Sequence, residues 1–323
     1  MTNALPSLPL VSIICPMHNE ANSIEALHSA LIEVFANHPQ THFEVVCIDD
    51  GSNDHTLSLL IRLNQHDARF KVVELSRRFG KEAALTAGMD NAIGDAVIPF
   101  DADLQDPPEL IPKMIKAWQA GAEVVLAKRV DRTVDSLAKR ITASWFYRLH
   151  NQIAEVAIPE NVGDFRLMDR KVVQALKLLP EQQRFMKGLF AWVGFSSVTI
   201  EYTRKERQAG KTKFSAWNLW NFAIEGITSF SAAPLKVWTY VGLAGALISF
   251  LYASFIVLRT ILFGIDVPGY ASLLVAILFL GSLQLISVGM LGEYIGRIYM
   301  ETKRRPSYLI RNTYGVDMKD ASQ

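Results

Sequence analysis

The sequence has no marked excess of either charge and contains very little cysteine. Its 33 lysine and arginine residues stand against 32 aspartate and glutamate residues, which argues against binding nucleic acid through bulk positive charge. The two cysteines, Cys15 and Cys47, lie in apolar runs outside any CxxC or Cys/His cluster, so we expect buried, reduced thiols rather than a disulfide. The N-terminus lacks the basic and apolar regions of a signal peptide.

Neither common glycine-rich phosphate-binding loop is present. A Rossmann dinucleotide site needs GxGxxG after the first strand, where this sequence has PMHNE at 16–20. A P-loop needs GxxxxGK followed by serine or threonine, but Gly80-Lys81 is followed by Glu82. Both motifs are therefore excluded. A nucleotide site in this chain would have to hold its phosphates with a metal ion and basic side chains.

Charged residues are absent from two long stretches near the end of the chain. Residues 237–258 are 22 consecutive uncharged residues, and residues 267–292 are 26 more. About 20 apolar residues in a helix span the hydrocarbon core of a bilayer, and neither stretch has the polar stripe of a soluble surface helix. We expect a transmembrane hairpin over 236–292, with helices at about 237–258 and 270–292. The alternative is a buried helical hairpin in a soluble core.

Most of the basic residues near this hairpin lie outside it in sequence, before the first helix or after the second, and few lie in the loop between the helices. Lys236 precedes it, Arg259 lies in its loop, and five cations follow it: Arg297, Lys303, Arg304, Arg305 and Arg311. The positive-inside rule therefore predicts a multi-pass protein with both termini in the cytoplasm. We expect a cytoplasmic catalytic domain over 1–213 and a cytoplasmic tail over 293–323. Tryptophans at helical spacing predict an interfacial helix over 214–235, and residues 145–148 are a candidate second one.

Apolar, strand-like runs alternate with helix-like segments in the first part of the chain. The expected strands are 10–15, 43–48, 70–75, 96–100 and 122–127, and the expected helices are about 22–35, 53–65, 81–92 and 108–120. This alternation predicts an α/β fold with a mainly parallel, helix-covered sheet. Ligands bind such sheets beyond the carboxyl ends of the strands.

Carboxylates follow three of the expected strands, in PMHNE at 16–20, DDGSND at 49–54 and DADLQDPP at 101–108. Asp101 and Asp103, with Gln105 as a neutral oxygen ligand, can hold a hard divalent cation that leaves positions open for a phosphate. The alternative is an acidic turn before a proline-started helix. Because Asp49 and Asp50 also follow a strand, carboxylates gather at more than one strand end, and we favour the metal site over the simple acidic turn.

These loops, together with SRRFGKEAALTAGMDNA at 76–92, resemble the family-2 glycosyltransferases with the GT-A fold. Three later segments narrow the resemblance to polyprenyl-phosphate glycosyltransferases, above all bactoprenol glucosyltransferases: ENVGDFRLMDRKVV at 160–173, ERQAGKTKFSAWNLWNFAIEGITSFS at 206–231 and GMLGEYIGRIYMETKRRP at 289–306. The resemblance runs from about Leu10 to Tyr308. It implies a Rossmann-like GT-A domain with interfacial helices and a C-terminal two-helix transmembrane hairpin.

The resemblance also implies a reaction and its site. Glucose would pass from UDP-glucose to undecaprenyl phosphate with inversion, at the bacterial inner membrane, for O-antigen modification, with Mg²⁺ or Mn²⁺ and in a homotetramer. The implied nucleotide-sugar site comprises Pro16, His18, Glu20, Asp49, Asp50, Asp101, Ala102 and Asp103, with Asp101, Asp103 and Gln105 on the metal. The implied catalytic residues are Arg129, Asp164, Arg207 and Lys213.

The acceptor that the resemblance implies is a phosphate, which is already anionic at neutral pH. It therefore needs positively charged side chains to bind it more than it needs a base. Arg129, Arg207 and Lys213 match cations that the family uses for phosphate groups. Asp164 would repel the acceptor unless it holds a proton or pairs with a cation, and Arg166 is close enough in sequence to pair with it. Whether Asp164 acts as a base, orients the sugar or tethers Arg166 stays open.

Other functions fit parts of the sequence less well. Another donor, such as UDP-aminoarabinose or another hexose, stays open. A processive polysaccharide synthase would need a QxxRW motif and more spans, and residues 182–185 match that motif only loosely. A transporter would need polar groups deep in its spans, where Gln284 is the one strongly polar side chain. A nucleotide sensor would tolerate loss of the DxD motif or the basic loop, and both are intact. An enzyme is therefore favoured.

Overall fold

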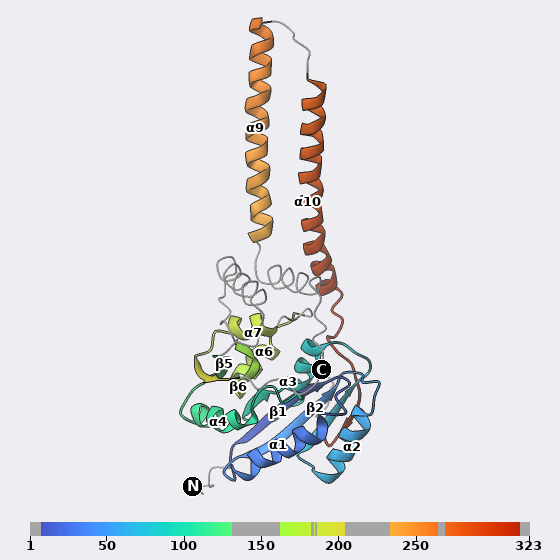
Figure 1. Cartoon of the computed structure of the whole chain (residues 1–323), viewed down its shortest axis with the longest axis vertical. Coiled ribbons are helices and arrows are strands. Elements are labelled where there is room, and N and C mark those ends of the chain that lie inside the picture. The colour runs from blue at the N-terminus through green and yellow to red at the C-terminus, as the bar shows by residue number, and fades with distance from the viewer. Residues whose placement is uncertain are drawn as a thin grey trace.

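The computed structural model describes residues 8–130, 162–181, 184, 186–203, 233–263 and 269–316 of the chain (Figure 1). The predicted interfacial helix at 214–235 lies almost wholly outside these ranges, as do the candidate helix at 145–148 and the predicted catalytic cations Arg207 and Lys213. The roles expected of these segments therefore stay predictions.

Eight strands of the described residues form one mixed sheet, in the order β7-β5-β6-β4-β1-β2-β3-β8. Their bounds are β1 (Leu10–Met17), β2 (His42–Asp49), β3 (Phe70–Leu75), β4 (Ala96–Pro99), β5 (Val124–Arg129), β6 (Val162–Asp169), β7 (Ser197–Tyr202) and β8 (Ile310–Tyr314). Strands β4, β1, β2 and β3 run parallel to one another, whereas β6 is antiparallel to β4 and β5, and β8 is antiparallel to β3. The prediction of a mainly parallel α/β sheet is confirmed.

Helices cover both faces of this sheet because its central strands are apolar on both sides. Helices α1 (Ile24–Ala36), α2 (Thr56–His66) and α4 (Ile111–Gln119) bury one face, and α3 (Lys81–Asn91), α6 (Arg170–Lys177) and α7 (Met186–Trp192) bury the other. Successive side chains of β1 alternate between the two cores, with Ile13 in the first and Ile14 in the second. A short 3₁₀ turn, η1 (Pro108–Leu110), precedes α4.

Helix α3 lies unusually close to the centre of the sheet. A Cβ on its Gly88 would stand 2.8 Å from the Ile48 side chain and 3.0 Å from that of Ile14. A larger residue would push the helix off β1 and β2. This close packing holds α3 against β1 and β2, and the helix begins at Lys81.

Cys15 and Cys47 are free and fully buried, as predicted. They are neighbours across the β1–β2 ladder. Burial raises the pKa of both thiols, that of Cys47 to about 12. Both are therefore protonated core residues at neutral pH.

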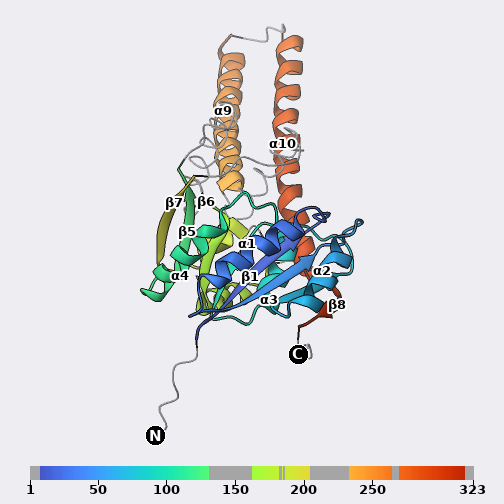
Figure 2. The ribbon, with the colours of Figure 1, turned by 60° about the horizontal axis from the view of Figure 1, so that its bottom comes forward.

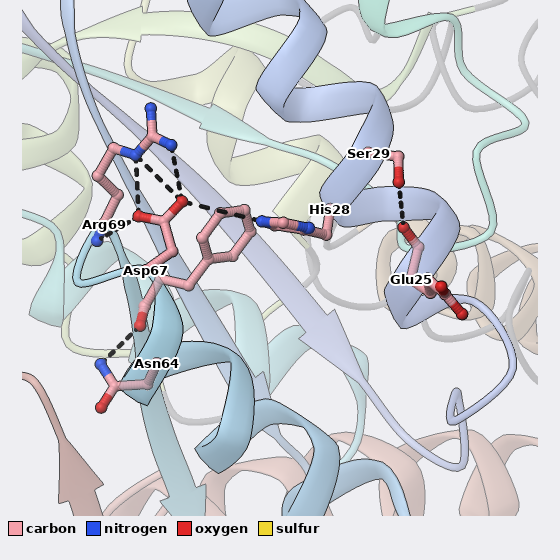
Figure 3. Close-up of polar contacts among 7 residues, drawn as sticks. Glu25, His28, Ser29, Asn64, Asp67 and Arg69 are labelled. Atoms are coloured by element: carbon pink, nitrogen blue, oxygen red, sulfur yellow. Dashed lines mark hydrogen bonds and ion pairs between the residues drawn. The ribbon is translucent and has the colours of Figure 1, made fainter.

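Polar contacts at the amino end of β3 join α1, α2 and the sheet (Figure 3). Asp67 ends α2, accepts a hydrogen bond from Arg69 Nη2 at 2.7 Å and faces His28 of α1 at 3.8 Å. The hydrogen bonds from Arg69 lower the pKa of Asp67, and Asn64 donates to the Phe70 carbonyl at 2.7 Å. This cluster lies at the opposite end of β3 from the carboxyl ends of the strands, so it is structural.

Two long helices extend away from the sheet, α9 (Ala233–Phe263) and α10 (Tyr270–Thr302), side by side in both views (Figures 1 and 2). Large apolar side chains on both are exposed, with Phe263 at 82% and Leu285 at 75%. Among the described residues, the stretch Phe279–Thr302 is long and apolar enough to cross a bilayer. Both helices continue beyond the apolar runs that predicted them.

After α10 the chain returns to the sheet. Strand β8 pairs antiparallel with β3, aligning Tyr314 with Val72. Arg311 and Asn312 of β8 both contact the Glu74 carboxylate, at 3.2 and 2.8 Å, and the Arg311 guanidinium donates to the Ser76 carbonyl at 2.7 Å. The segment that we expected to be a tail therefore contains the end of α10 and an edge strand of the sheet.

Candidate active site

An open pocket of about 290 Å³ lies beyond the carboxyl ends of β1, β2 and β4. Residues predicted for the nucleotide-sugar site line most of it: Pro16, His18, Glu20, Asp50, Asp101, Ala102 and Asp103. The remaining predicted member, Asp49, lies beneath the pocket at the end of β2 and is 2% exposed. Met17, Arg78, Lys81 and Ala84 also line the pocket, and none of them was predicted from the sequence.

The loops after β1 and β2 hold each other in place. The Asn19 N–H donates to Ser52 Oγ at 3.0 Å, the Asn53 N–H donates back to Asn19 Oδ1 at 2.8 Å, and the Glu20 N–H donates to Thr56 Oγ1 at 2.9 Å. Asn19 has a φ of 58°, a left-handed conformation that asparagine tolerates better than most residues. This cross-linking directs His18 and Glu20 into the pocket.

Asp50 fixes the loop that leads into α3. Its carboxylate accepts hydrogen bonds from the Phe79 N–H at 2.6 Å and the Gly80 N–H at 2.9 Å. Gly51 has a φ of 62°, and a Cβ there would stand 2.5 Å from the Arg78 nitrogen. The loop at 77–80 thus rests directly on the turn after β2. Asp50 orients Arg78 and Lys81 through this loop, besides lining the pocket itself.

Lys81 joins two of the predicted carboxylates. Its Nζ lies 2.8 Å from Asp101 Oδ1 and 2.9 Å from Asp164 Oδ2. Burial would lower the pKa of Lys81, but the two carboxylates outweigh it and raise that pKa. Burial likewise favours a raised pKa for Asp164, but Lys81 outweighs it and the pKa of Asp164 is lowered. Both groups are therefore charged at neutral pH.

This pairing bears on the role of Asp164. The direct partner of Asp164 is Lys81, whereas the Arg166 guanidinium donates to the Gly163 carbonyl at 2.8 Å and lies 4.0 Å from the centre of the Phe190 ring. Burial lowers the pKa of Arg166 to about 10. Arg166 therefore acts on Asp164 through its charge, while Asp164 pairs directly with Lys81 of α3.

Glu82, a half-buried acid on α3, lies close to this pair in charge interaction. Burial, and then the Asp164 charge, raise the pKa of Glu82 to about 7, while a hydrogen bond from the Met186 N–H opposes the shift. Its Oε2 has no hydrogen-bond partner among the described residues. Glu82 thus changes charge near neutral pH behind the pocket.

Arg129, the predicted acceptor-side arginine, ends β5 and is held by two residues that were not predicted. Its Nε donates to the Tyr202 hydroxyl at 3.1 Å, and its Nη2 lies 3.8 Å from Asp106 Oδ1. The Tyr202 hydroxyl donates to Asp106 Oδ1 at 2.5 Å. Burial and then the Asp106 charge raise the pKa of Tyr202 to about 12. A neutral phenol therefore bridges the arginine and the carboxylate.

The residues of the DxD turn suit a divalent cation. Asp101 and Asp103 line the same pocket, Gln105 is 9% exposed behind them, and the intervening Leu104 has a φ of 53°. No group of three or more His, Cys, Asp or Glu residues is assembled as a metal site within the described ranges. One or two carboxylates suffice, however, when substrate phosphates complete the shell. Asp101 already binds a cation, the Lys81 ammonium, so the donor set fits.

Comparison with known proteins identifies the family. The model of glycosyl transferase family 2 matches residues 12–177, about half of the chain, and the model of the GtrB C-terminal hairpin matches residues 233–298. The chain belongs to glycosyl transferase family 2. This glycosyltransferase is an enzyme with the GT-A fold, and all residues that line its pocket lie within the family match.

Relatives of this glycosyltransferase match over nearly its whole length. It is 54% identical to a bactoprenol glucosyl transferase of Shigella phage SfV over 94% of this chain and 98% of that protein. It is 53% identical to a prophage bactoprenol glucosyl transferase homolog of Escherichia coli (strain K12), over 93% and 98%. With the uncharacterized glycosyltransferase YkcC of Bacillus subtilis (strain 168) the identity is 43%, over 95% of each chain. The matched hairpin covers α9 and most of α10, in keeping with association with a membrane.

Proposed function

We propose that this enzyme moves glucose from UDP-glucose to undecaprenyl phosphate, giving undecaprenyl-phosphate glucose and UDP for O-antigen modification. The observation that carries the proposal is a pocket of carboxylates and cations in a domain that bears an apolar helical hairpin. A soluble sugar nucleotide and a membrane-bound acceptor have to meet at such a place. The near full-length likeness to bactoprenol glucosyl transferases supports the acceptor and the sugar.

The donor would occupy the pocket at the ends of β1, β2 and β4. His18 and Glu20 line this pocket and would border the nucleoside, while Arg78 and Lys81, also in the lining, would face its phosphates. Asp101 and Asp103, with Gln105, would hold Mg²⁺ or Mn²⁺. When bound, that ion supplies Lewis-acid stabilisation of the charge on the departing UDP.

The acceptor phosphate would approach from the side of Arg129, with Arg207 and Lys213 closing over it. A phosphate oxygen attacks the anomeric carbon, and the carbon–oxygen bond to UDP breaks with its electron pair leaving on UDP. Because the attacking oxygen is already anionic, no base has to remove a proton. Asp164, ionised and paired with Lys81, then orients the sugar hydroxyls. Attack opposite the leaving group inverts the anomeric centre.

The membrane arrangement belongs to the same proposal. Helices α9 and α10 both cross the inner membrane, so the catalytic domain over 1–213 and both termini face the cytoplasm, with 214–235 at the interface. The cations that follow the second apolar run support this orientation. A homotetramer remains the expected assembly.

Transfer to lipid tests the proposal directly. The full-length enzyme is incubated with undecaprenyl phosphate, Mg²⁺ or Mn²⁺ and a panel of UDP- and GDP-sugars, and the lipid products are identified by mass spectrometry. We expect one added hexose, from UDP-glucose. Transfer from UDP-aminoarabinose or another hexose donor, and from no other, would show that the transferred sugar is not glucose. A growing polymer would indicate a processive synthase. No sugar on the lipid with any donor would contradict the proposal.

A further inference from the structure

Lys81 occupies an electrostatically unfavourable position. It is the first residue of α3, where the helix dipole and the free N–H groups repel a cation. Its ammonium is nevertheless held by two carboxylates that come from different parts of the chain, Asp101 after β4 and Asp164 on β6. The two acids therefore determine where this side chain lies, and the helix does not.

The ammonium contacts both oxygens of Asp101. Nζ lies 2.8 Å from Oδ1 and 3.0 Å from Oδ2. A Mg²⁺ ion needs carboxylate oxygens at about 2.0–2.1 Å, so it cannot bind Asp101 without meeting the Lys81 charge at close range. Two cations sharing one carboxylate repel each other strongly in a partly buried site. Binding of the metal thus requires the amine to move.

We propose that Lys81 is the resident counter-cation of Asp101, and that a divalent metal displaces it onto Asp164 and the donor diphosphate. The inference rests on the metal site of the proposed function. Asp164 gives the amine a second anionic partner at 2.9 Å, so leaving Asp101 does not leave the charge unpaired. The donor supplies phosphate oxygens for both the metal and the amine.

One consequence is that metal and nucleotide bind cooperatively. Without nucleotide, the metal competes with Lys81 for Asp101 and binds weakly. With nucleotide, the diphosphate takes over the amine and adds ligands to the metal. Because such coupling is reciprocal, the metal raises nucleotide affinity by the same factor. Lys81 would in this way act as a positioning residue that keeps the metal site closed until a donor is present.

The test is Mn²⁺ binding to the full-length protein, followed by the electron paramagnetic resonance signal of free Mn²⁺, with and without UDP. Replacing Lys81→Met removes the charge and keeps a similar length. We expect Mn²⁺ to bind this variant about tenfold more tightly than wild type in the absence of UDP, because the competing cation is gone. UDP should then raise the affinity of the variant for Mn²⁺ much less than it raises that of wild type.

Arg78→Met is the matched control, since Arg78 is a cation that lines the same pocket while the described partner of Asp101 is Lys81. It should tighten Mn²⁺ binding by no more than about twofold to threefold, as expected for a more distant charge. Asp164→Asn tests whether the Lys81 ammonium needs Asp164 as a partner when it leaves Asp101. It removes the second partner of the amine, so Mn²⁺ should bind more weakly than to wild type.

Two results would overturn this inference and leave the proposed function intact. One is an unchanged Mn²⁺ affinity of Lys81→Met in the absence of UDP, and the other is an equal gain in Mn²⁺ affinity in Arg78→Met. In either case wild type would still bind Mn²⁺ with UDP and still transfer sugar to lipid. Absence of Mn²⁺ binding by wild type and Lys81→Met, with and without UDP, would instead remove the metal from the proposed function and this inference with it. Melting temperatures of all variants confirm that each is folded.

Discussion

The two halves of the catalytic sheet differ in how they build their sites. On the proposed donor side, β1, β2, β3 and β4 run parallel, and each is followed in sequence by residues that line the pocket. On the proposed acceptor side, β6 runs antiparallel to its neighbours, and Arg129 is held by Tyr202, 73 residues later. The proposed donor site is thus made of local strand–loop units, whereas the proposed acceptor site depends on contacts between distant parts of the chain. A change on the donor side should act on nucleotide and metal, and one on the acceptor side on the lipid.

The largest expected effect is on the donor side, at the DxD turn. Replacing Asp103→Asn removes a negative charge from the proposed metal site without changing the side-chain shape. We expect transfer to fall by roughly 10²–10³-fold, the scale of losing one preorganised electrostatic group, with the melting temperature unchanged. Glu25→Gln, an exposed carboxylate on α1, is the control and should behave as wild type. Near wild-type turnover of Asp103→Asn with metal present would show that Asp103 is not a ligand.

A comparable or smaller loss is expected from the acceptor-side cations that lie outside the described residues. Replacing Arg207→Ala or Lys213→Ala should remove about 2–4 kcal/mol of transition-state stabilisation. The melting temperature of the unliganded protein should barely move, because exposed charges contribute little to folding. Transfer rate and melting temperature are measured on the same variants. A large fall in melting temperature with a proportional loss of rate would make these residues structural.

Tyr202→Phe sharpens the comparison with a milder change. The variant loses the hydroxyl that links Arg129 to Asp106, so the arginine is less well oriented for the acceptor. We expect the KM for undecaprenyl phosphate to rise several-fold, the KM for the sugar nucleotide to stay constant, and stability to fall by about 1–2 kcal/mol. Steady-state kinetics with each substrate varied in turn decide this. A rise in the KM for the sugar nucleotide alone would contradict the proposal that this half of the sheet acts on the acceptor.

The smallest expected effect concerns pH and the half-buried acid Glu82 of α3. The pKa of Glu82 is raised to about 7 in the folded protein, so between its ordinary value and about 7 the folded state holds a proton that the unfolded state has lost. Stability from this group is present at low pH and is lost as the pH rises through 7. Glu82→Gln should therefore show a flatter fall in melting temperature between pH 5 and 8. An unchanged pH profile would mean that Glu82 is ionised throughout.

The local character of the donor half explains why it was predictable. An apolar strand followed by a polar loop is visible in the sequence at 10–20, 43–54 and 96–108, and the parallel topology brings these loops together. Lys81 was missed because its partners are carboxylates 20 and 83 residues away. In the sequence it is merely the lysine of an incomplete P-loop. Its position directly after Gly80, at the start of the helix expected at about 81–92, was the available signal.

Strand β8 was missed for a different reason. Its five residues, IRNTY, alternate only weakly and follow a cationic stretch, so they give little strand signal by themselves. The strand forms because β3 offers an unpaired edge on which Glu74 can bind Arg311 and Asn312. Tyr202 and Asp106 were likewise unreadable as a pair, since 96 residues separate them.

The return of the chain to β3 also has a consequence for biosynthesis. Residues 10–202 contain seven of the eight described strands, yet the edge of β3 receives its partner only from residues 310–314. A ribosome therefore completes both α9 and α10 before β8 can pair with β3. Until that moment the nascent domain exposes an unpaired strand edge, the kind of surface on which chains aggregate. Completion of the helical hairpin thus precedes the pairing of this strand edge, and a chain released before residue 310 would leave the edge of β3 exposed.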